Sequence, residues 1–306
     1  PVDVAVIEVG MGGKWDSTNV ADGDIAVFTP IGFDHQQWLG DNLFDIAATK
    51  SGIIKPNATV IRSVQEPEVA DILDQKANDE NARVLRESQE LFVVDRQFAV
   101  GGQVLTLQTP AATYEGLFLP LHGKHQAHNA LLALAAVETL LGGRKALDPE
   151  LVAEGFATVS SPGRLELVKD SPTILVDVAH NPHGARALCE ALSEAFNFNN
   201  LIGVVGMMAD KDVDGFLSEI EPQLDKIILT KNSSARCADP SDIYGTAVEI
   251  FGEDRVIVQP NLPEALAEAV ELAEAADATG MGTGAGVLVT GSVVTVADAR
   301  KLLGRR

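Results

Sequence analysis

The sequence predicts an α/β protein of two domains, the second of them a doubly wound α/β domain. The chain has 306 residues, which is room for two domains of ordinary size. Short apolar runs alternate with helical patterns in both halves, as they do in parallel sheets with crossover helices. A turn-forming Ser-Ser-Pro-Gly cluster at 160–163 separates the halves. We therefore expect domains at residues 1–160 and 161–306.

In the first domain we expect a buried parallel strand over 2–9, further strands over 25–29 and from 60, and helices over 41–51 and 66–81. Residues 83–122 differ, because short alternating strands with Gly and Pro turns predict a small antiparallel annex. Its expected strands are 84–85, 91–94, 103–107 and 114–119. A helix rich in Ala and Leu over 125–142 follows, and Gly142-Gly143 is expected to end it.

The second domain shows a regular alternation of strands and helices. The expected strands are 173–178, 201–205, 226–229, 255–258 and 287–290, and the expected helices are 183–196, 212–223, 240–251 and 262–278. The Gly-rich stretch 279–286 precedes a strand, whereas a phosphate loop joins a strand to a helix. We therefore interpret it as a flexible connection.

Charge and composition exclude several classes of protein. Lys and Arg number 23 and Asp and Glu number 44, a formal net charge of −21. A chain this acidic has no general positive field for nucleic acid or an anionic membrane. The longest apolar run, 130–137, is far shorter than the ~20 residues of a membrane helix. Cys189 and Cys237 form no disulfide or metal pattern. We expect a cytoplasmic protein. If it binds phosphate groups, a metal ion, a helix N-terminus or a few placed cations must hold them.

Two polar side chains follow neighbouring strands of the first domain. Glu8 stands at the end of the expected strand 2–9, and His35 follows the next strand. Ligands of open α/β sheets bind beyond the carboxyl ends of the strands, so a carboxylate and an imidazole there can converge on one metal ion. The alternative is that Glu8 caps a helix and His35 is an ordinary loop residue. Spacing by itself leaves both interpretations open.

The second domain offers a candidate nucleotide site at the end of its first expected strand. Asp177 and His180 flank the point where this strand enters a helix, and Arg164 precedes the strand. A helix N-terminus attracts anions, an Asp can bind ribose hydroxyls, and a His or Arg can bind phosphate. Helix capping by Asn181, with Pro182 in the first turn, is the alternative. Capping explains those two residues but leaves Asp177 and His180 unexplained.

Seven motifs occur in order along nearly the whole chain. They are EVGMGG at 8–13 with Asp16, Thr18 and Asn19, IGFDH at 31–35, KSGIIKP at 50–56, GKHQAHN at 123–129, PGRLE at 162–166, DVAHNPH at 177–183 and VTGS at 289–292. In this order they resemble the folylpolyglutamate synthase/dihydrofolate synthase family of the Mur ligase superfamily. The resemblance implies a partial Mur-ligase-type central ATPase domain, with a parallel sheet and the antiparallel annex, and a C-terminal Rossmann-like domain.

The resemblance also implies an activity. The family joins L-glutamate to a folate or dihydropteroate carboxylate. ATP phosphorylates that carboxylate and the glutamate amine attacks the acyl phosphate, so the chemistry is mainly positioning and charge neutralisation. The implied cofactors are ATP and Mg²⁺. Mn²⁺ substitution is expected to be tolerated, since imidazole is not a preferred magnesium ligand. The sequence does not distinguish a preference for dihydropteroate from one for folate.

By the same resemblance, Glu8 and His35 are ligands of one of two magnesium ions, and Lys50 is a carbamylated lysine. A lysine that is desolvated near a metal can lose its proton and add CO₂, which turns a cation into a metal-binding anion. The alternative for Lys50 is an exposed helix lysine, the usual fate of this residue. Trp38 is either an aromatic neighbour of the pterin or metal site or, the interpretation that we favour, a residue of the core.

The resemblance assigns the nucleotide contacts to both domains. Asn129 is the implied contact to adenine, Asp177 the contact to the ribose, and Arg164 and His180 are further nucleotide contacts. Substrate binding by this acidic chain then depends on such local groups, because folate, glutamate and ATP are all anionic.

The sequence departs from the family in one respect. A phosphate loop of the Gly-x-x-Gly-Lys-Ser/Thr type is absent, since Trp15 follows Gly13-Lys14 and His125 follows Gly123-Lys124. We therefore expect a fragment that lacks an N-terminal segment and is inactive alone, from an enzyme that is a monomer when complete. The alternatives are a non-catalytic nucleotide-binding remnant and another Mur-type ligase, such as one acting on peptidoglycan precursors. The motifs at 10–13 and 177–182 favour the folate branch.

Overall fold

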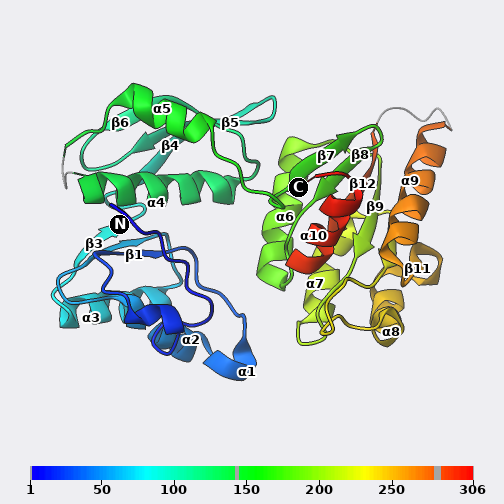
Figure 1. Cartoon of the computed structure of the whole chain (residues 1–306), viewed down its shortest axis with the longest axis horizontal. Helices are drawn as coiled ribbons and strands as arrows, with labels where there is room; N and C mark the ends of the chain where they lie inside the picture. The colour runs from blue at the N-terminus through cyan, green and yellow to red at the C-terminus, as the bar shows by residue number, and fades with distance from the viewer. Residues whose placement is uncertain (1, 142–144, 279–283, 306) are drawn as a thin grey trace. The chain divides into compact units, whose positions relative to one another are not determined.

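The computed structural model describes residues 2–141, 145–278 and 284–305 (Figure 1). The chain forms two compact units, the first containing Pro1–Pro120 and His125–Thr158, the second Leu121–Lys124 and Val159–Arg306. The expected helix stop at Gly142-Gly143 and residues 279–283 of the Gly-rich stretch lie outside the described residues. Within the described part, no helix combines the length and the apolar character needed to cross a membrane.

The first unit is built on a small parallel sheet, as predicted. Its strands are β1 (Ile25–Phe28), β2 (Thr59–Arg62) and β3 (Arg83–Arg86), in the order β1-β2-β3. The helices are α1 (Gln36–Leu39), α2 (Leu43–Lys50) and α3 (Pro67–Asp79). Ile46 of α2, Val60 of β2 and Leu73 of α3 are fully buried in one core. Parallel pairing places the carboxyl ends of all three strands at the same edge of the sheet.

Two strand predictions for this unit are wrong. Residues 2–9 contain no strand, and Val2 and Val6 are 81% and 96% exposed. The apolar pattern suits a strand, but a strand also needs a hydrogen-bonded neighbour, and no described strand pairs with this segment. Residues 83–86 were expected in the antiparallel annex, yet β3 pairs in parallel with β2. The apolar stretch that forms β3 is so short that its sequence pattern does not indicate which sheet it joins.

The antiparallel annex is present and consists of β4 (Phe92–Ala99), β5 (Gly102–Gln108) and β6 (Thr113–Leu119). The helices α4 (Lys124–Leu141) and α5 (Pro149–Ala157) accompany it (Figure 1). The Tyr114 hydroxyl on β6 donates to Glu138 of α4 over 2.6 Å and accepts from the Leu147 amide over 2.8 Å. This buried hydroxyl therefore ties the annex to α4 and to the chain that leads into α5.

The second unit has the predicted doubly wound architecture, with a six-stranded sheet in the order β11-β10-β9-β12-β8-β7. All neighbours are parallel except β7, which is antiparallel to β8. The strands are β7 (Glu166–Asp170), β8 (Thr173–Val176), β9 (Asn200–Val205), β10 (Lys226–Leu229), β11 (Val256–Val258) and β12 (Ala285–Thr290). The helices are α6 (Pro182–Ala195), α7 (Val213–Ile220), α8 (Pro240–Phe251), α9 (Leu262–Ala278) and α10 (Val293–Leu302). Short 3-10 turns lie at Ser17–Val20, Ser51–Ile53, Glu221–Gln223 and Glu253–Arg255.

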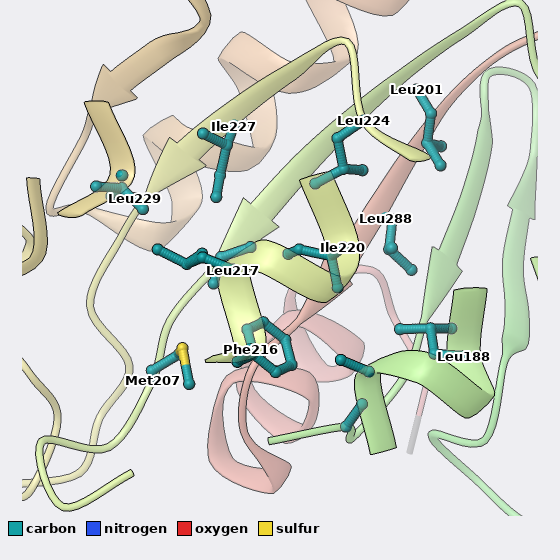
Figure 2. Packing of buried hydrophobic residues seen from close by; sticks show 14 of the residues in the cluster. Leu188, Leu201, Met207, Phe216, Leu217, Ile220, Leu224, Ile227, Leu229 and Leu288 are labelled. Atoms are coloured by element: carbon teal, nitrogen blue, oxygen red, sulfur yellow. The ribbon is translucent and has the colours of Figure 1, made fainter. Parts of the chain in front are cut away.

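Two apolar cores hold this sheet between its helices. Figure 2 shows one of them, in which Phe216, Leu217 and Ile220 of α7 pack among apolar side chains of the strands and of α6. The other core contains side chains of α9 and α10. Burial on both faces explains why β9 and β12 are apolar along almost their whole length. Strand β7 and helix α10 were not among the predicted elements.

Candidate functional site

The glycine-rich loop that contains Gly13 packs closely against the end of helix α2, which carries Lys50. The Lys14 amide donates to the Thr49 carbonyl over 2.9 Å. A Cβ atom on Gly13 would lie 2.8 Å from the carbonyl oxygens of both Thr49 and Lys50. Only a residue without a side chain permits this approach. The glycines of the first motif therefore set the position of the loop against the Lys50 backbone.

Asp16 closes the same loop on itself. Its carboxylate accepts from the Met11 amide over 2.8 Å, from the Thr18 amide over 2.9 Å and from the Thr18 hydroxyl over 2.6 Å. The bonds from the Thr18 hydroxyl and amide, and then that from Met11, lower the pKa of Asp16 to about 2. The Asn19 carbonyl accepts from Lys55 Nζ over 2.8 Å. These motif residues therefore have structural roles that spacing did not reveal.

Gly13→Ala is expected to lower the free energy of unfolding by about 1–3 kcal/mol, because the new methyl group must displace backbone carbonyls at the end of α2. Gly23→Ala is the matched control, since a Cβ atom there meets only the Ile25 carbonyl, at an ordinary 3.6 Å. Urea denaturation of both variants measures the difference. Equal stabilities of the two variants would contradict the close approach at Gly13.

His35 lies beside the carboxylate of Asp34, and the charge of this carboxylate also acts on Lys50. The His35 amide donates to Asp34 Oδ1 over 2.8 Å, and His35 Nε2 lies 3.7 Å from Asp34 Oδ2. Burial lowers the pKa of Lys50, and the negative charge of Asp34 opposes this shift. The structure thus adds Asp34, which contacts His35 and whose charge acts on Lys50. The signal for Asp34 was its position beside His35 in the IGFDH motif.

Glu8 does not join this group. It lies in the exposed segment 2–9 and makes no hydrogen bond or ion pair with any described residue. Across the described part of the chain, no three His, Cys, Asp or Glu side chains cluster as metal ligands would. Asp34 and His35 offer one oxygen and one nitrogen donor, so the residues fit a magnesium ion only in part. The metal site at Glu8, His35 and Lys50 stays a prediction.

Trp38 belongs to the short helix α1, and its expected place in the core is wrong. The residue is 75% exposed. It follows His35, which has a left-handed backbone with φ 52° at the start of this helix. A four-residue helix buries little, so a neighbouring aromatic side chain can stay in solvent.

The second unit organises its candidate site around a buried carboxylate. Asp177 directly follows β8 and is 8% exposed. Its Oδ2 accepts from the Leu165 amide over 2.8 Å, and its Oδ1 accepts from the Ala179 amide over 2.8 Å. Burial raises the pKa of Asp177, while these two bonds and the charges of Arg164 and His180 oppose the rise. Asp177 therefore fixes both loops that carry the other predicted residues.

Arg164 and His180 lie on those two loops. Arg164 is exposed, and His180 Nδ1 hydrogen-bonds the Val178 carbonyl over 2.9 Å. Asn181 caps α6, because its side-chain oxygen accepts from the Gly184 amide over 2.8 Å. The capping interpretation is thus right for Asn181, and Asp177 has a structural task as well. Arg164 nevertheless brings a positive charge that acts on Asp177, and α6 begins at Pro182, an arrangement that suits an anionic ligand.

Asn129, the predicted adenine contact, lies on α4 in the first unit. It is partly buried, and its amide donates to Gln126 Oε1 over 3.3 Å. The arrangement leaves the side-chain oxygen of Asn129 as an acceptor. Its role toward adenine stays a prediction.

The two units match two family profiles. Residues 1–137 match the Mur ligase middle domain, and residues 163–293 match the Mur ligase glutamate ligase domain. The dihydrofolate synthase/folylpolyglutamate synthase of Mycobacterium tuberculosis is 46% identical, over 100% of this chain and 65% of that protein. The Bacillus subtilis protein of the same name is 29% identical, over 99% of this chain and 68% of that protein. This chain thus spans about two thirds of the length of these relatives.

Solved structures agree with this likeness. Mycobacterium tuberculosis folylpolyglutamate synthase complexed with ADP and AMPPCP has a TM-score of 0.96 and 46% identity to this chain, and the match covers 100% of this chain and 70% of that one. A folylpolyglutamate synthase complex with AMPPCP and folate has a TM-score of 0.83 and 28% identity, and that match covers 98% and 66%.

Proposed function

This chain belongs to the folylpolyglutamate synthase/dihydrofolate synthase family of Mur ligases, and from that membership we propose that it supplies ATP-binding and ligase parts of an enzyme that adds L-glutamate to folate. Dihydropteroate is a second proposed acceptor, because relatives carry both names. The observation that carries the proposal is the group of Asp177, Arg164 and His180 at the N-terminus of α6.

The proposed reaction has two steps. An oxygen of the acceptor carboxylate attacks the γ-phosphorus of ATP, and ADP leaves. The amine of glutamate then attacks the carbonyl carbon of the acyl phosphate, inorganic phosphate leaves, and the nitrogen loses a proton. In both steps the reacting groups bring negative charge close together. Catalysis therefore needs cations at fixed positions and correctly oriented substrates. Magnesium, when bound with ATP, neutralises phosphate charge.

The residues of the second unit serve the nucleotide in this proposal. Arg164 and His180 hold phosphate oxygens, and Asp177 keeps their loops in place and faces the ribose. Asn129 on the first unit contacts adenine. For the metal we propose Glu8, His35 and Lys50, the last as a carbamate. Because the neutral amine is the form that adds CO₂, the lowered pKa of Lys50 supports this modification.

The decisive test is substrate dependence in the protein that carries this chain. ADP formation is expected only when ATP, L-glutamate and a folate or dihydropteroate acceptor are all present, with a product heavier by one glutamyl residue in mass spectrometry. Arg164→Ala is expected to raise the KM for ATP about tenfold or more, the loss of one charge-assisted phosphate contact. Arg186→Ala is the control, since Arg186 is an exposed arginine of α6 that pairs with Glu219. ADP formation that needs a peptidoglycan precursor as acceptor would contradict the proposal.

A further inference from the structure

Gln65 uses both ends of its side chain to join two loops at the carboxyl edge of the first sheet. Its Nε2 donates to the Thr29 carbonyl over 2.9 Å and to the Ser63 hydroxyl over 3.1 Å. Its Oε1 accepts from the Ile31 amide over 2.9 Å. Thr29 and Ile31 follow β1, whereas Ser63 follows β2. One side chain thus bridges residues 34 and 36 positions away in the sequence.

These bonds continue the β1–β2 ladder beyond its last backbone pair. Phe28, the end of β1, accepts from the Ser63 amide over 2.9 Å. Beyond it, the Thr29 carbonyl and the Ile31 amide find their partners on Gln65. Pro30 lies between them and has no backbone N–H, so one hydrogen bond of a regular strand ladder cannot form there. A side-chain amide supplies the donor and acceptor that the strand pair lacks.

The segment held in this way leads directly to Asp34 and His35. Ile31 opens the IGFDH motif, so its anchored amide lies three residues before Asp34, whose charge acts on Lys50, and four residues before His35. His35 adopts a left-handed backbone, which a non-glycine residue keeps only where the surrounding structure holds it. Anchoring the start of the segment therefore limits where the Asp34 carboxylate and the His35 ring lie.

A buried carboxylate holds Gln65 itself in place. Glu87 Oε2 accepts from the amide of Val64, the residue before Gln65, over 3.1 Å. Glu87 Oε1 hydrogen-bonds Nδ1 of His128 on α4. His128 precedes Asn129 in the chain. Hydrogen bonds to a buried carboxylate are costly to break, so these two tie the backbone next to Gln65 to the helix of the predicted adenine contact.

We infer that Gln65 is a positioning residue for the ligase reaction, because it fixes the loop of Asp34 and His35 against a backbone that Glu87 ties to α4. The inference rests on the proposed function. Gln65 needs no contact with substrate: it acts through the loop. A displacement of about 1 Å in such a loop can cost on the order of 100-fold in rate without changing the overall fold.

The test compares Gln65→Met with Gln75→Met. Methionine has a similar shape but none of the three hydrogen bonds. Gln75 lies on α3, where its amide donates only to Asp79 one turn away. In the protein that carries this chain, Gln65→Met is expected to lower kcat about tenfold or more, with less than about a twofold change in the KM for the acceptor. Gln65→Glu, which keeps the acceptor for Ile31, is expected to lie between Gln65→Met and the wild type. Gln75→Met is expected to match the wild type.

Amide hydrogen exchange tests the contact without relying on ligase activity. Loss of one hydrogen bond is expected to speed exchange at Ile31 about three- to tenfold in Gln65→Met, and to leave it unchanged in Gln75→Met. Unchanged exchange at Ile31, or an unchanged kcat of Gln65→Met in an active enzyme, would overturn the inference. A wild-type protein that is inactive with every acceptor would instead refute the proposed function, while the exchange result would still decide whether Gln65 anchors the loop.

Discussion

Asp177→Ala is expected to lower the free energy of unfolding of the second unit by about 2–5 kcal/mol and to weaken nucleotide binding at least about 100-fold. The substitution removes both acceptors of the Leu165 and Ala179 amides, and each buried amide without a partner costs about 1–3 kcal/mol. It also releases the two loops that carry Arg164 and His180. Urea denaturation and calorimetric titration with ADP measure the two effects.

Two further variants separate the roles of Asp177. Asp177→Asn keeps one acceptor but turns an NH₂ group toward the other amide, so we expect it to be intermediate in stability. Asp170→Ala is the control, because Asp170 is an exposed aspartate on β7 of the same sheet. Asp170→Ala is expected to stay within about 0.5 kcal/mol of the wild type. If Asp177→Ala behaved like this control, the carboxylate would have no structural importance.

Lys50→Ala is expected to lower kcat of the ligase by on the order of 100-fold or more, while the free energy of unfolding changes little. In our proposal the carbamate on Lys50 is an anion that binds metal, and alanine removes it. Lys50→Arg keeps a cation on the helix but cannot add CO₂, so it is expected to lose as much activity as Lys50→Ala. Small carboxylates such as formate are expected to restore part of the activity of Lys50→Ala.

The modification itself is observable apart from catalysis. When the protein is equilibrated with ¹³C-labelled bicarbonate, a carbamate carbon signal is expected in the wild type and not in Lys50→Arg. Addition of CO₂ forms a nitrogen–carbon bond and releases a proton, so a lower amine pKa lets the carbamate form at a lower pH than on an ordinary lysine. Full activity of Lys50→Arg, or a wild type without the signal at saturating bicarbonate, would refute the carbamate.

The fold of the second unit could be predicted almost completely. Its strands are apolar because both faces of the sheet are buried, and its helices show the helical period clearly. The edge strand β7 escaped prediction because three of its five residues are exposed, so its pattern is weak. The opposite error arose at residues 2–9, where an apolar pattern meets no strand that pairs with it.

The candidate site could be predicted in its residue types but not in its contacts. The motifs led to His35, Lys50, Asp177 and His180, and to the family. They did not show that Asp34 contacts His35, or that Asp177 binds the amide of Leu165. Gln65 carries no motif signal, and only its bonds to Thr29 and Ile31 draw attention to it.

The amino-acid order alone thus determined the α/β class, the family and the residues that carry charge, because periodicity and motifs are local properties of the chain. Tertiary structure decided which segments pair as strands and which side chains meet. The bond from Leu165 to Asp177 spans 12 positions, and that from Ile31 to Gln65 spans 34. Contacts over such separations depend on how the strands align and pack, and this packing is a property of the folded chain as a whole.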